Sequence, residues 1–524
     1  MFFRYYGDNP FVKNAQDNLS TFAIDVDTAS YPMARKYLRD GKLPPRAAIR
    51  SEEFLNYFDH KLAAPTEGDF AVHLQAAPTP FTEGKNNILL KVGVKGREVD
   101  SAERKPLNLV FVIDKSGSMK ENNRMELVKR SLELLVDQLR EDDQVGIVSF
   151  DSSGHIVMES TKGAERWKLR EALRQMDPGG STNAAEGMYL GYEMLSRNYL
   201  EGATNRVILA SDGVANTGET DQQRILDRIA DFTSRQVDLT TIGVGMNNHN
   251  DVFLEQMANK GDGSCHYVDD FDEAKHVFIE RFSGTMQTIA RDVKIQVEFD
   301  EAQVLGWRQI GYENRSLQDH QFRDDRVDAG EVGAGHEIVA LYEVQLKDEW
   351  KASAEGRLAT VRLRWKPDGA ERSSETGVVP AVEQPFAIDM NQIQPKWQET
   401  EAHFRLAAVT AQYAEFMRRS YHVRGDNYTV LQAAANRLAS ELHGDQKVAE
   451  LGKLITETRR LVQFQPPTDE LWQLIEQSRR LTLLHQELHQ LEQRNQETAE
   501  LMAELQAQNA ELEQRIRQHL EGRN

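Results

Sequence analysis

The sequence contains one cysteine, no long apolar run and no excess of positive charge. Because Cys265 is the only cysteine among the 524 residues, an intramolecular disulfide framework and a cysteine-rich zinc site are excluded. No apolar run approaches the ~20 residues needed to cross a bilayer, so we expect no membrane span. The formal net charge of −20, without basic stretches that interleave aromatics, argues against nucleic-acid binding.

The N-terminal stretch MFFRYYGDNPF has neither an apolar export segment nor a lipid-attachment cysteine. The chain as written is therefore expected to be soluble. If it is exported, its leader has been removed or lies upstream of Met1. Its length allows several cores, since a single domain usually holds roughly 100 to 200 residues.

The spacing of apolar residues changes along the chain. Residues 1–65 begin as loop and then show helical spacing. From Leu107, near-continuous apolar runs such as LNLVFVI, QVGIVSF and NRVILAS alternate with helical stretches such as RMELVKRSLELLVDQLR. Strands buried on both faces have this character, so residues 107–290 are predicted to form a Rossmann-like, doubly wound α/β domain.

Alternation of period two marks strands on both sides of this unit, at 66–100 and at 291–395. We predict one β-sandwich-like domain built from both flanks, with the α/β domain inserted between them. Two unrelated β pieces are the alternative. Residues 396–465 have helical spacing throughout.

A heptad repeat follows the helix-breaking QPPT and fills residues 468–524. Most a and d positions hold Leu, Met or Ile, and Asn495 and Asn509 occupy two of the a positions. This pattern predicts a parallel coiled coil and a homo-oligomer. A helix folded back onto its own domain is the alternative.

The stretch FVIDKSGSM ends an apolar strand on Asp114 and follows it with Ser116 and Ser118. An aspartate nucleophile of the haloacid-dehalogenase type needs a second carboxylate two residues later, where this chain has Ser116. Asp25 and Asp27 have that spacing but lie outside the α/β repeat. A serine nucleophile would need a base and an oxyanion hole, and neither an elbow motif nor a nearby histidine is present.

A metal site explains the cluster better, because other strand ends of the predicted sheet supply more oxygen ligands. Thr182 lies in the glycine-rich loop PGGSTNAAEGM, and Asp212 ends the strand in VILASDG. The carboxyl ends of parallel strands share one edge of a sheet, which would bring these side chains to the loop that follows Asp114. Mg²⁺ prefers about six oxygen ligands and keeps some of its water.

The motif Asp114-x-Ser116-x-Ser118, with Thr182 and Asp212, resembles the metal-ion-dependent adhesion site (MIDAS) of von Willebrand factor type A (VWA) domains. The stretches STFAIDVDTASYPMARKYLRDGKLPP, IGYENRSL and VDAGEVGAGHEIVALYEV resemble the bacterial YfbK-like family of such proteins, from about residue 15 to 465.

The resemblance implies a binding protein rather than an enzyme. Ser116, Ser118 and Thr182 would ligate Mg²⁺ (or Mn²⁺ or Ca²⁺), directly or through water, and Asp114 and Asp212 would hold it largely through water. A partner's Asp or Glu would complete the shell. The resemblance also implies a MoxR-type AAA+ ATPase as partner and a place in the periplasm or cell envelope. A metal-dependent hydrolase or phosphatase, and a coiled-coil scaffold with a vestigial metal site, are the rival interpretations. The hydrolase would need a general base beside the metal, and we expect neither a histidine nor a third carboxylate at these strand ends. Lys115 is expected to be a solvated surface charge.

Overall fold

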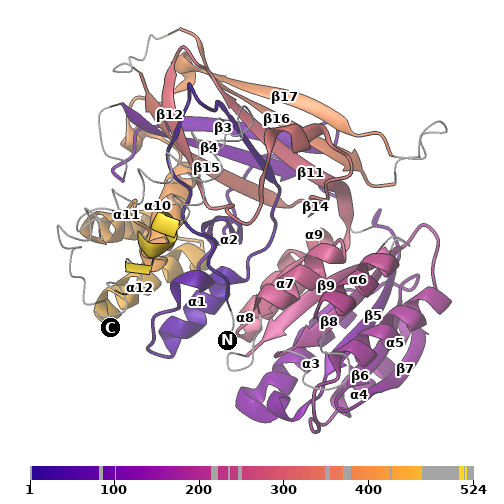
Figure 1. Cartoon of the computed structure of the whole chain (residues 1–524). Helices are drawn as coiled ribbons and strands as arrows, with labels where there is room; N and C mark the ends of the chain where they lie inside the picture. Colours follow the sequence, from indigo (N-terminus) through magenta and orange to yellow (C-terminus); the bar gives the residue numbers. More distant parts are fainter. Residues whose placement is uncertain are drawn as a thin grey trace.

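The computed structural model describes residues 3–81, 86–100, 102–213, 222–233, 237–245, 251–347, 355–369, 379–423 and 428–462, with short helical stretches between 507 and 518. These residues form an α/β domain, a β-sandwich and a helical region, which lie beside one another in Figure 1. The predicted coiled coil at 468–524 falls almost wholly outside the described residues. No helix in the described ranges is long and apolar enough to cross a membrane.

The α/β domain has a six-stranded sheet in the order β10-β9-β8-β5-β6-β7. Its strands are β5 (Leu107–Asp114), β6 (Gln144–Phe150), β7 (Gly154–Lys162), β8 (Thr204–Ser211), β9 (Asp238–Val244) and β10 (Cys265–Val268). All neighbours are parallel except β6 and β7, which pair antiparallel. The predicted doubly wound fold is confirmed.

Helices cover both faces of this sheet. On one face lie α3 (Arg124–Asp137), α4 (Arg166–Arg174) and α8 (Phe271–Lys275), and on the other α5 (Ala184–Arg197), α6 (Gln222–Thr233) and α7 (Asp251–Lys260). Alternate residues of β5 enter the two cores: Phe111 packs in the first and Val112 in the second. Both faces are buried, which is why the sequence of this strand is almost continuously apolar.

The sandwich is built from both flanks of the α/β domain. One sheet has the order β1-β12-β15-β4-β3 and the other β13-β2-β11-β16-β17, with β14 also on β11. The first comprises β1 (Val12–Lys13), β12 (Val304–Ile310), β15 (Glu337–Leu346), β4 (Asn87–Gly96) and β3 (Phe70–Ala77). The second comprises β13 (Ser316–Leu317), β2 (Leu19–Ala23), β11 (Thr288–Phe299), β16 (Arg357–Pro367), β17 (Val382–Asp389) and β14 (Gly330–Gly333).

Pairing across the insertion joins the flanks, since Leu90 of β4 lies opposite Tyr342 of β15 in an antiparallel register. One core contains residues of both flanks, among them Leu90, Val297 and Tyr342. The insertion of the α/β domain into a sandwich is thus confirmed, and the alternative of two unrelated β pieces is wrong.

Residues 1–65, expected to be helix and loop, also contribute strands β1 and β2 to the sandwich. In β2 the polar side chains of Ser20 and Thr21 are buried. The hydroxyl of Ser20 lies 3.1 Å from that of Tyr342, and Thr21 donates to Asp319 at 2.7 Å. Partners 298 and 322 residues away in the sequence satisfy these groups, so local apolar alternation was too weak to predict the strand.

The helical region combines both ends of the described chain. Helices α1 (Ser30–Arg39) and α2 (Ser51–Tyr57) share one core with α10 (Ala402–Met417), α11 (Tyr428–Glu441) and α12 (Gln446–Leu461). The predicted helices of 396–465 are present, and the N-terminal helices pack on them rather than apart.

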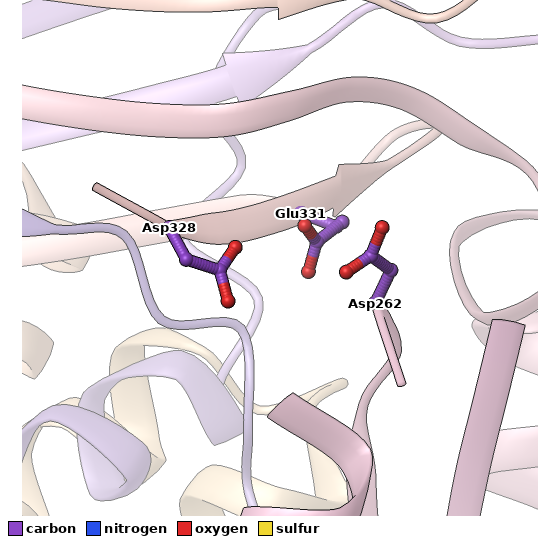
Figure 2. Close-up of side chains that lie close together, drawn as sticks. All are labelled: Asp262, Asp328 and Glu331. Carbon is purple, nitrogen blue, oxygen red and sulfur yellow. The ribbon is translucent and has the colours of Figure 1, made fainter. Parts of the chain in front are cut away.

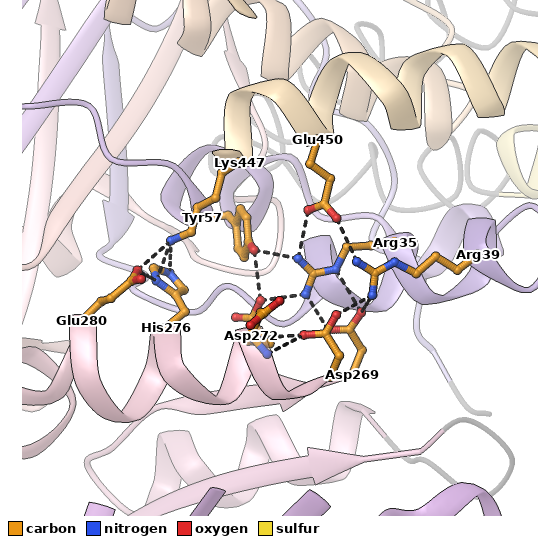
Figure 3. Close-up of polar contacts among 11 residues, drawn as sticks. Arg35, Arg39, Tyr57, Asp269, Asp272, His276, Glu280, Lys447 and Glu450 are labelled. Atoms are coloured by element: carbon orange, nitrogen blue, oxygen red, sulfur yellow. Dashed lines mark hydrogen bonds and ion pairs between the residues drawn. The ribbon is translucent and has the colours of Figure 1, made fainter. Parts of the chain in front are cut away.

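Ion pairs between charged side chains join this helical region to the α/β domain (Figure 3). Arg35 of α1 is buried; it contacts Asp269, donates to Glu273 at 2.8 Å and pairs with Glu450 of α12 at 3.1 Å. Lys447 of α12 lies 3.2 Å from Glu280, in the π-helical turn His276–Glu280 that follows α8. This turn leads through α9 (Phe282–Met286) into β11, so the segment leaving the α/β domain is held from two sides.

Candidate metal centre

The two predicted carboxylates lie at the ends of neighbouring parallel strands. Asp114 is the last residue of β5, and Asp212 directly follows β8, whose residue Ala210 pairs with Ile113. Both carboxylates are buried, with 0% of Asp114 and 2% of Asp212 exposed. The Oγ of Ser211 donates to Asp114 Oδ2 at 2.7 Å and so fixes that side chain.

Ser116 and Ser118 connect Asp114 to Asp212 through hydrogen bonds. Asp114 Oδ1 accepts the backbone N–H of Ser116 at 2.8 Å, which curls the chain back over the strand end. The Oγ atoms of Ser116 and Ser118 are 3.0 Å apart, and Ser118 Oγ donates to Asp212 Oδ1 at 2.9 Å. The predicted residues therefore form a continuous line of oxygen atoms across two strand ends.

The loop that carries Thr182 is hydrogen-bonded to the loop that carries Ser116 and Ser118. The N–H of Gly117 donates to the carbonyl of Gly180 at 3.0 Å, and the N–H of Gly179 donates to the carbonyl of Lys115 at 2.6 Å. Gly180 has a φ of +85°, and a Cβ there would lie 3.0 Å from Asp151 Cβ, so the turn requires glycine. The loop carrying Thr182, which is buried, is thus bonded to the loop carrying the serines.

Burial raises the pKa of Asp114 to about 6; hydrogen bonds from Ser116 and Ser211 oppose this rise, and the charge of Asp212 adds to it. An ionised carboxylate in this position is poorly solvated. A bound cation would therefore relieve an unfavourable charge as well as make its own contacts.

The donor set suits a small, hard divalent cation. Every candidate donor is oxygen, which is the ligand type that Mg²⁺, Mn²⁺ and Ca²⁺ prefer. Adjacent ligands of an octahedral Mg²⁺, at bond lengths of about 2.1 Å, lie about 3.0 Å apart. The spacing from Ser116 Oγ to Ser118 Oγ, 3.0 Å, matches that edge. Asp212 Oδ1 accepts a hydrogen bond from Ser118 Oγ at 2.9 Å, which suits a carboxylate that holds the ion largely through water.

Arg124, the first residue of α3, lies at this site and was not predicted from the sequence. Its side chain is 2% exposed and its Nη1 contacts Asp212 Oδ2. A basic residue at a helix N-terminus opposes the helix dipole, and this was the available signal that Arg124 has a partner elsewhere.

Asp151, which follows β6, is a third carboxylate near the site. It pairs with Lys115 at 2.9 Å, and His155 Nε2 lies 3.6 Å from its Oδ1. The sequence-based expectation that no third carboxylate or histidine lies at these strand ends is therefore wrong. Lys115, expected to be a solvated charge, is an ion-pair partner.

A separate acidic group lies where the α/β domain meets the sandwich (Figure 2). Carboxylate oxygens of Asp262, Asp328 and Glu331 lie within 4.8 Å of one another, and Arg291 pairs with Asp262 at 2.9 Å. Burial raises the pKa of Asp262 to about 7, against the opposing charge of Arg291. None of these three residues belongs to the predicted site.

Asp25 and Asp27, the rejected phosphatase candidates, are buried, hydrogen-bonded groups. Asp27 Oδ1 accepts the backbone N–H of Cys265 at 2.9 Å, and Arg315 lies 3.1 Å from Asp25 Oδ1. Asp27 thereby ties the loop after β2 to β10. Cys265 itself is buried and forms no disulfide.

Comparisons with known proteins agree with this architecture. The family described as "von Willebrand factor type A domain" matches residues 108–280, "Uncharacterized protein YfbK, C-terminal" matches 284–461, and "von Willebrand factor" matches 1–90. The protein named "Uncharacterized protein YfbK" of Escherichia coli (strain K12) is 34% identical over 464 residues, which cover 84% of this chain and 78% of that protein.

More distant relatives share part of the chain. Inter-alpha-trypsin inhibitor heavy chain H3 of Homo sapiens is 27% identical over 271 residues, so the match spans 48% of this chain and less than a third, 30%, of that protein. A solved structure named "von Willebrand factor type A from Catenulispora acidiphila" is 15% identical and covers 75% of this chain and 91% of its own, with a TM-score of 0.42. On the identity and coverage of the Escherichia coli relative, this chain belongs to the YfbK family of proteins, which carry a von Willebrand factor type A domain.

Proposed function

We propose that this protein is a divalent-metal-dependent protein-binding module, in which Mg²⁺ or a similar ion is completed by an Asp or Glu of a partner. The observation that carries the proposal is the line of oxygens from Ser116 through Ser118 to Asp212, at spacings of 3.0 and 2.9 Å. VWA domains typically bind a divalent metal and often mediate metal-dependent protein interactions, which supports the same interpretation.

The proposed ligands leave the ion able to accept another anionic group. Ser116, Ser118 and Thr182 would contribute neutral hydroxyl oxygens, while Asp114 and Asp212 would act largely through water. When bound, the ion would supply a Lewis-acidic point that attracts a carboxylate from outside. The chain's own residues fix the donors in place, because Asp114 and Asp212 are held by Ser211 and Ser118.

The rival function, a metal-dependent hydrolase or phosphatase, needs a general base beside the ion. Asp151, which follows the neighbouring strand β6 and pairs with Lys115, is one candidate. Although its partial burial opposes the effect, hydrogen bonds from Lys115 and backbone amides hold the pKa of Asp151 below its usual value. A carboxylate tied up in this way is a poor proton acceptor at neutral pH, which favours binding over hydrolysis. A scaffold with a vestigial metal site is the third possibility.

The proposal extends to assembly. The heptads of 468–524 would hold the protein as a homo-oligomer and present several metal sites together, which raises avidity for a multivalent partner. A MoxR-type AAA+ ATPase is proposed as one partner on the family resemblance.

The test compares Asp114→Ala with Asp142→Ala, an exposed carboxylate before β6 at the opposite edge of the sheet. We expect calorimetry to show Mn²⁺ binding to the wild type and to Asp142→Ala but not to Asp114→Ala. Partner recovery in a pull-down should require Mg²⁺ and should be lost with Asp114→Ala alone. Equal recovery with Mg²⁺ and with a chelator would refute the binding function. Phosphatase or esterase turnover that disappears with Asp114→Ala would support the hydrolase instead.

A further inference from the structure

Arg124 places a buried positive charge against the metal centre. Only 2% of its side chain is exposed, the same fraction as for Asp212. Its Nη1 contacts Asp212 Oδ2 and donates to the carbonyl of Ser118 at 3.2 Å, so it touches both the carboxylate and the loop that carries the serines. Glu121 also approaches Arg124, at 3.4 Å, but its side chain is 55% exposed and its charge is screened by solvent.

The fold makes room for this guanidinium. Gly245, directly after β9, has a φ of +76°, and a Cβ at this position would lie 2.1 Å from Arg124 Nε. Within the described residues, Nε itself has no hydrogen-bond partner. The contact with Asp212 and the space at Gly245 therefore position the guanidinium, although not every one of its N–H groups has a hydrogen-bond acceptor.

The charge count at the site changes because of Arg124. Asp114 and Asp212 together carry two negative charges, which would neutralise a divalent ion completely. With Arg124 included, the same site holding a divalent ion keeps one positive charge. Charge in a buried site is weakly screened, so a difference of one unit acts strongly on the next ion or group that binds.

We propose that Arg124 sets the charge of the metal centre so that the ion is held tightly only together with an anionic group from outside. This inference rests on the proposed function and adds its regulation. Arg124 weakens the binding of the metal alone by repulsion and by engaging Asp212. A carboxylate at the ion restores neutrality, so metal and carboxylate each strengthen the binding of the other by the same factor. Arg124 is in this sense a specificity-determining residue for acidic partners.

The experiment measures Mn²⁺ binding to the full chain by calorimetry, in sodium acetate and in sodium chloride at equal ionic strength. Acetate serves as the carboxylate probe. For the wild type we expect acetate to tighten Mn²⁺ binding several-fold. For Arg124→Gln we expect Mn²⁺ to bind about tenfold more tightly in chloride than to the wild type, with little further gain from acetate. Arg124→Lys keeps the charge and should behave like the wild type.

A second measurement compares melting temperatures, which report the stability of the variant and its metal binding together. Removing Arg124 leaves Asp212 unpaired, so metal-free Arg124→Gln should melt at a lower temperature than the wild type. Mn²⁺ should then raise the melting temperature of Arg124→Gln more than that of the wild type, because it binds the variant more tightly. The acetate effect on the wild type needs no variant at all.

The outcomes separate this inference from the proposed function. Mn²⁺ binding that survives Asp114→Ala overturns the proposed function, and this inference with it. Mn²⁺ binding that requires Asp114 but is unchanged or weaker in Arg124→Gln overturns only the role of Arg124. An absence of any acetate effect on the wild type also overturns the role of Arg124, whatever the variants show.

Discussion

Arg35 and Asp269 form an ion pair in which both partners are buried, with 5% and 0% of their side chains exposed. Arg35 lies on α1, outside the α/β domain, and Asp269 directly follows its edge strand β10. The pair therefore crosses the boundary between the helical region and the α/β domain (Figure 3).

Replacing Arg35 should loosen this boundary. Arg35→Ala removes the ion-pair partner of buried Glu273 and leaves buried Asp269 with only the 3.5 Å contact to exposed Arg39, which costs about 3–5 kcal/mol. Arg39→Ala is the matched control: Arg39 contacts Asp270 and Glu450 from the same helix, but it is 44% exposed and should cost about 1 kcal/mol or less. Thermal melts of the full chain measure both. Equal losses for the two variants would contradict a structural role for the buried pair.

Thr182 should contribute to metal binding through its hydroxyl group. Thr182→Ala removes a proposed ligand and should weaken Mn²⁺ binding about tenfold or more, whereas Thr182→Ser keeps the oxygen and should bind nearly as the wild type does. Ser181→Ala is the neighbouring control, since the Ser181 hydroxyl lies 3.1 Å from that of Ser152. Calorimetry with Mn²⁺ distinguishes them, and a normal affinity of Thr182→Ala would remove Thr182 from the ligand set.

The acidic group of Figure 2 should make the protein less stable as pH rises. Burial, with the charge of Asp262, raises the pKa of Glu331 well above its usual value, and burial raises that of Asp262 to about 7. The folded chain then holds more protons than the unfolded chain between about pH 4 and pH 7. The free energy of unfolding therefore falls as pH rises through this window.

Glu331→Gln should reduce this loss of stability at high pH. At pH 8 the substitution should raise the melting temperature by about 2–4 °C, and at pH 4.5 the gain should be smaller because the wild-type group is then already protonated. Glu201→Gln alters an exposed glutamate and should change neither value. The idea fails if Glu331→Gln gives the same shift at both pH values.

The heptad tail should control assembly. Deletion of residues 468–524 should convert a dimer to a monomer by light scattering. Leu488→Asp, at an a position of the repeat, should have the same effect, while Gln486→Asp, two residues earlier on the outer face, should leave the dimer intact. A mass unchanged by the deletion would refute the coiled coil as the source of the oligomer.

Secondary structure could be predicted best from the sequence where a single requirement, such as burial of a strand on both faces, determined the residue types. The apolar run from Leu107 to Ile113 needs burial on both faces, which predicts a central parallel strand and places Asp114 at its carboxyl end. Ser116, Ser118 and Asp212 were found at strand ends in the same way, Thr182 was found in a glycine-rich loop that opens a helix, and the resemblance to the MIDAS motif joined the five. The register of the sandwich strands could not be predicted from the sequence. The pairing of Leu90 with Tyr342, for example, joins strands that are some 250 residues apart in the chain.

The residues that could not be predicted from the sequence are those whose contacts come entirely from the tertiary structure. Arg124 fills a space left by Gly245, and Asp151 meets Lys115 from a neighbouring loop. Neither relationship has a characteristic spacing along the chain. Strand β2 is short and partly polar, and it is stabilised by contacts with residues such as Tyr342 that no local window contains.

The insertion also sets an order of events during synthesis. The α/β domain is contiguous from Leu107 to Met286, so it can fold on its own contacts as soon as it leaves the ribosome. Strands β3 and β4, made earlier, can pair with each other but must wait for β15 at residues 337–346 before their sheet is complete. Until then the edge of β4 is open to other strands, which makes the emergence of β15 the step that protects the nascent chain from mispairing.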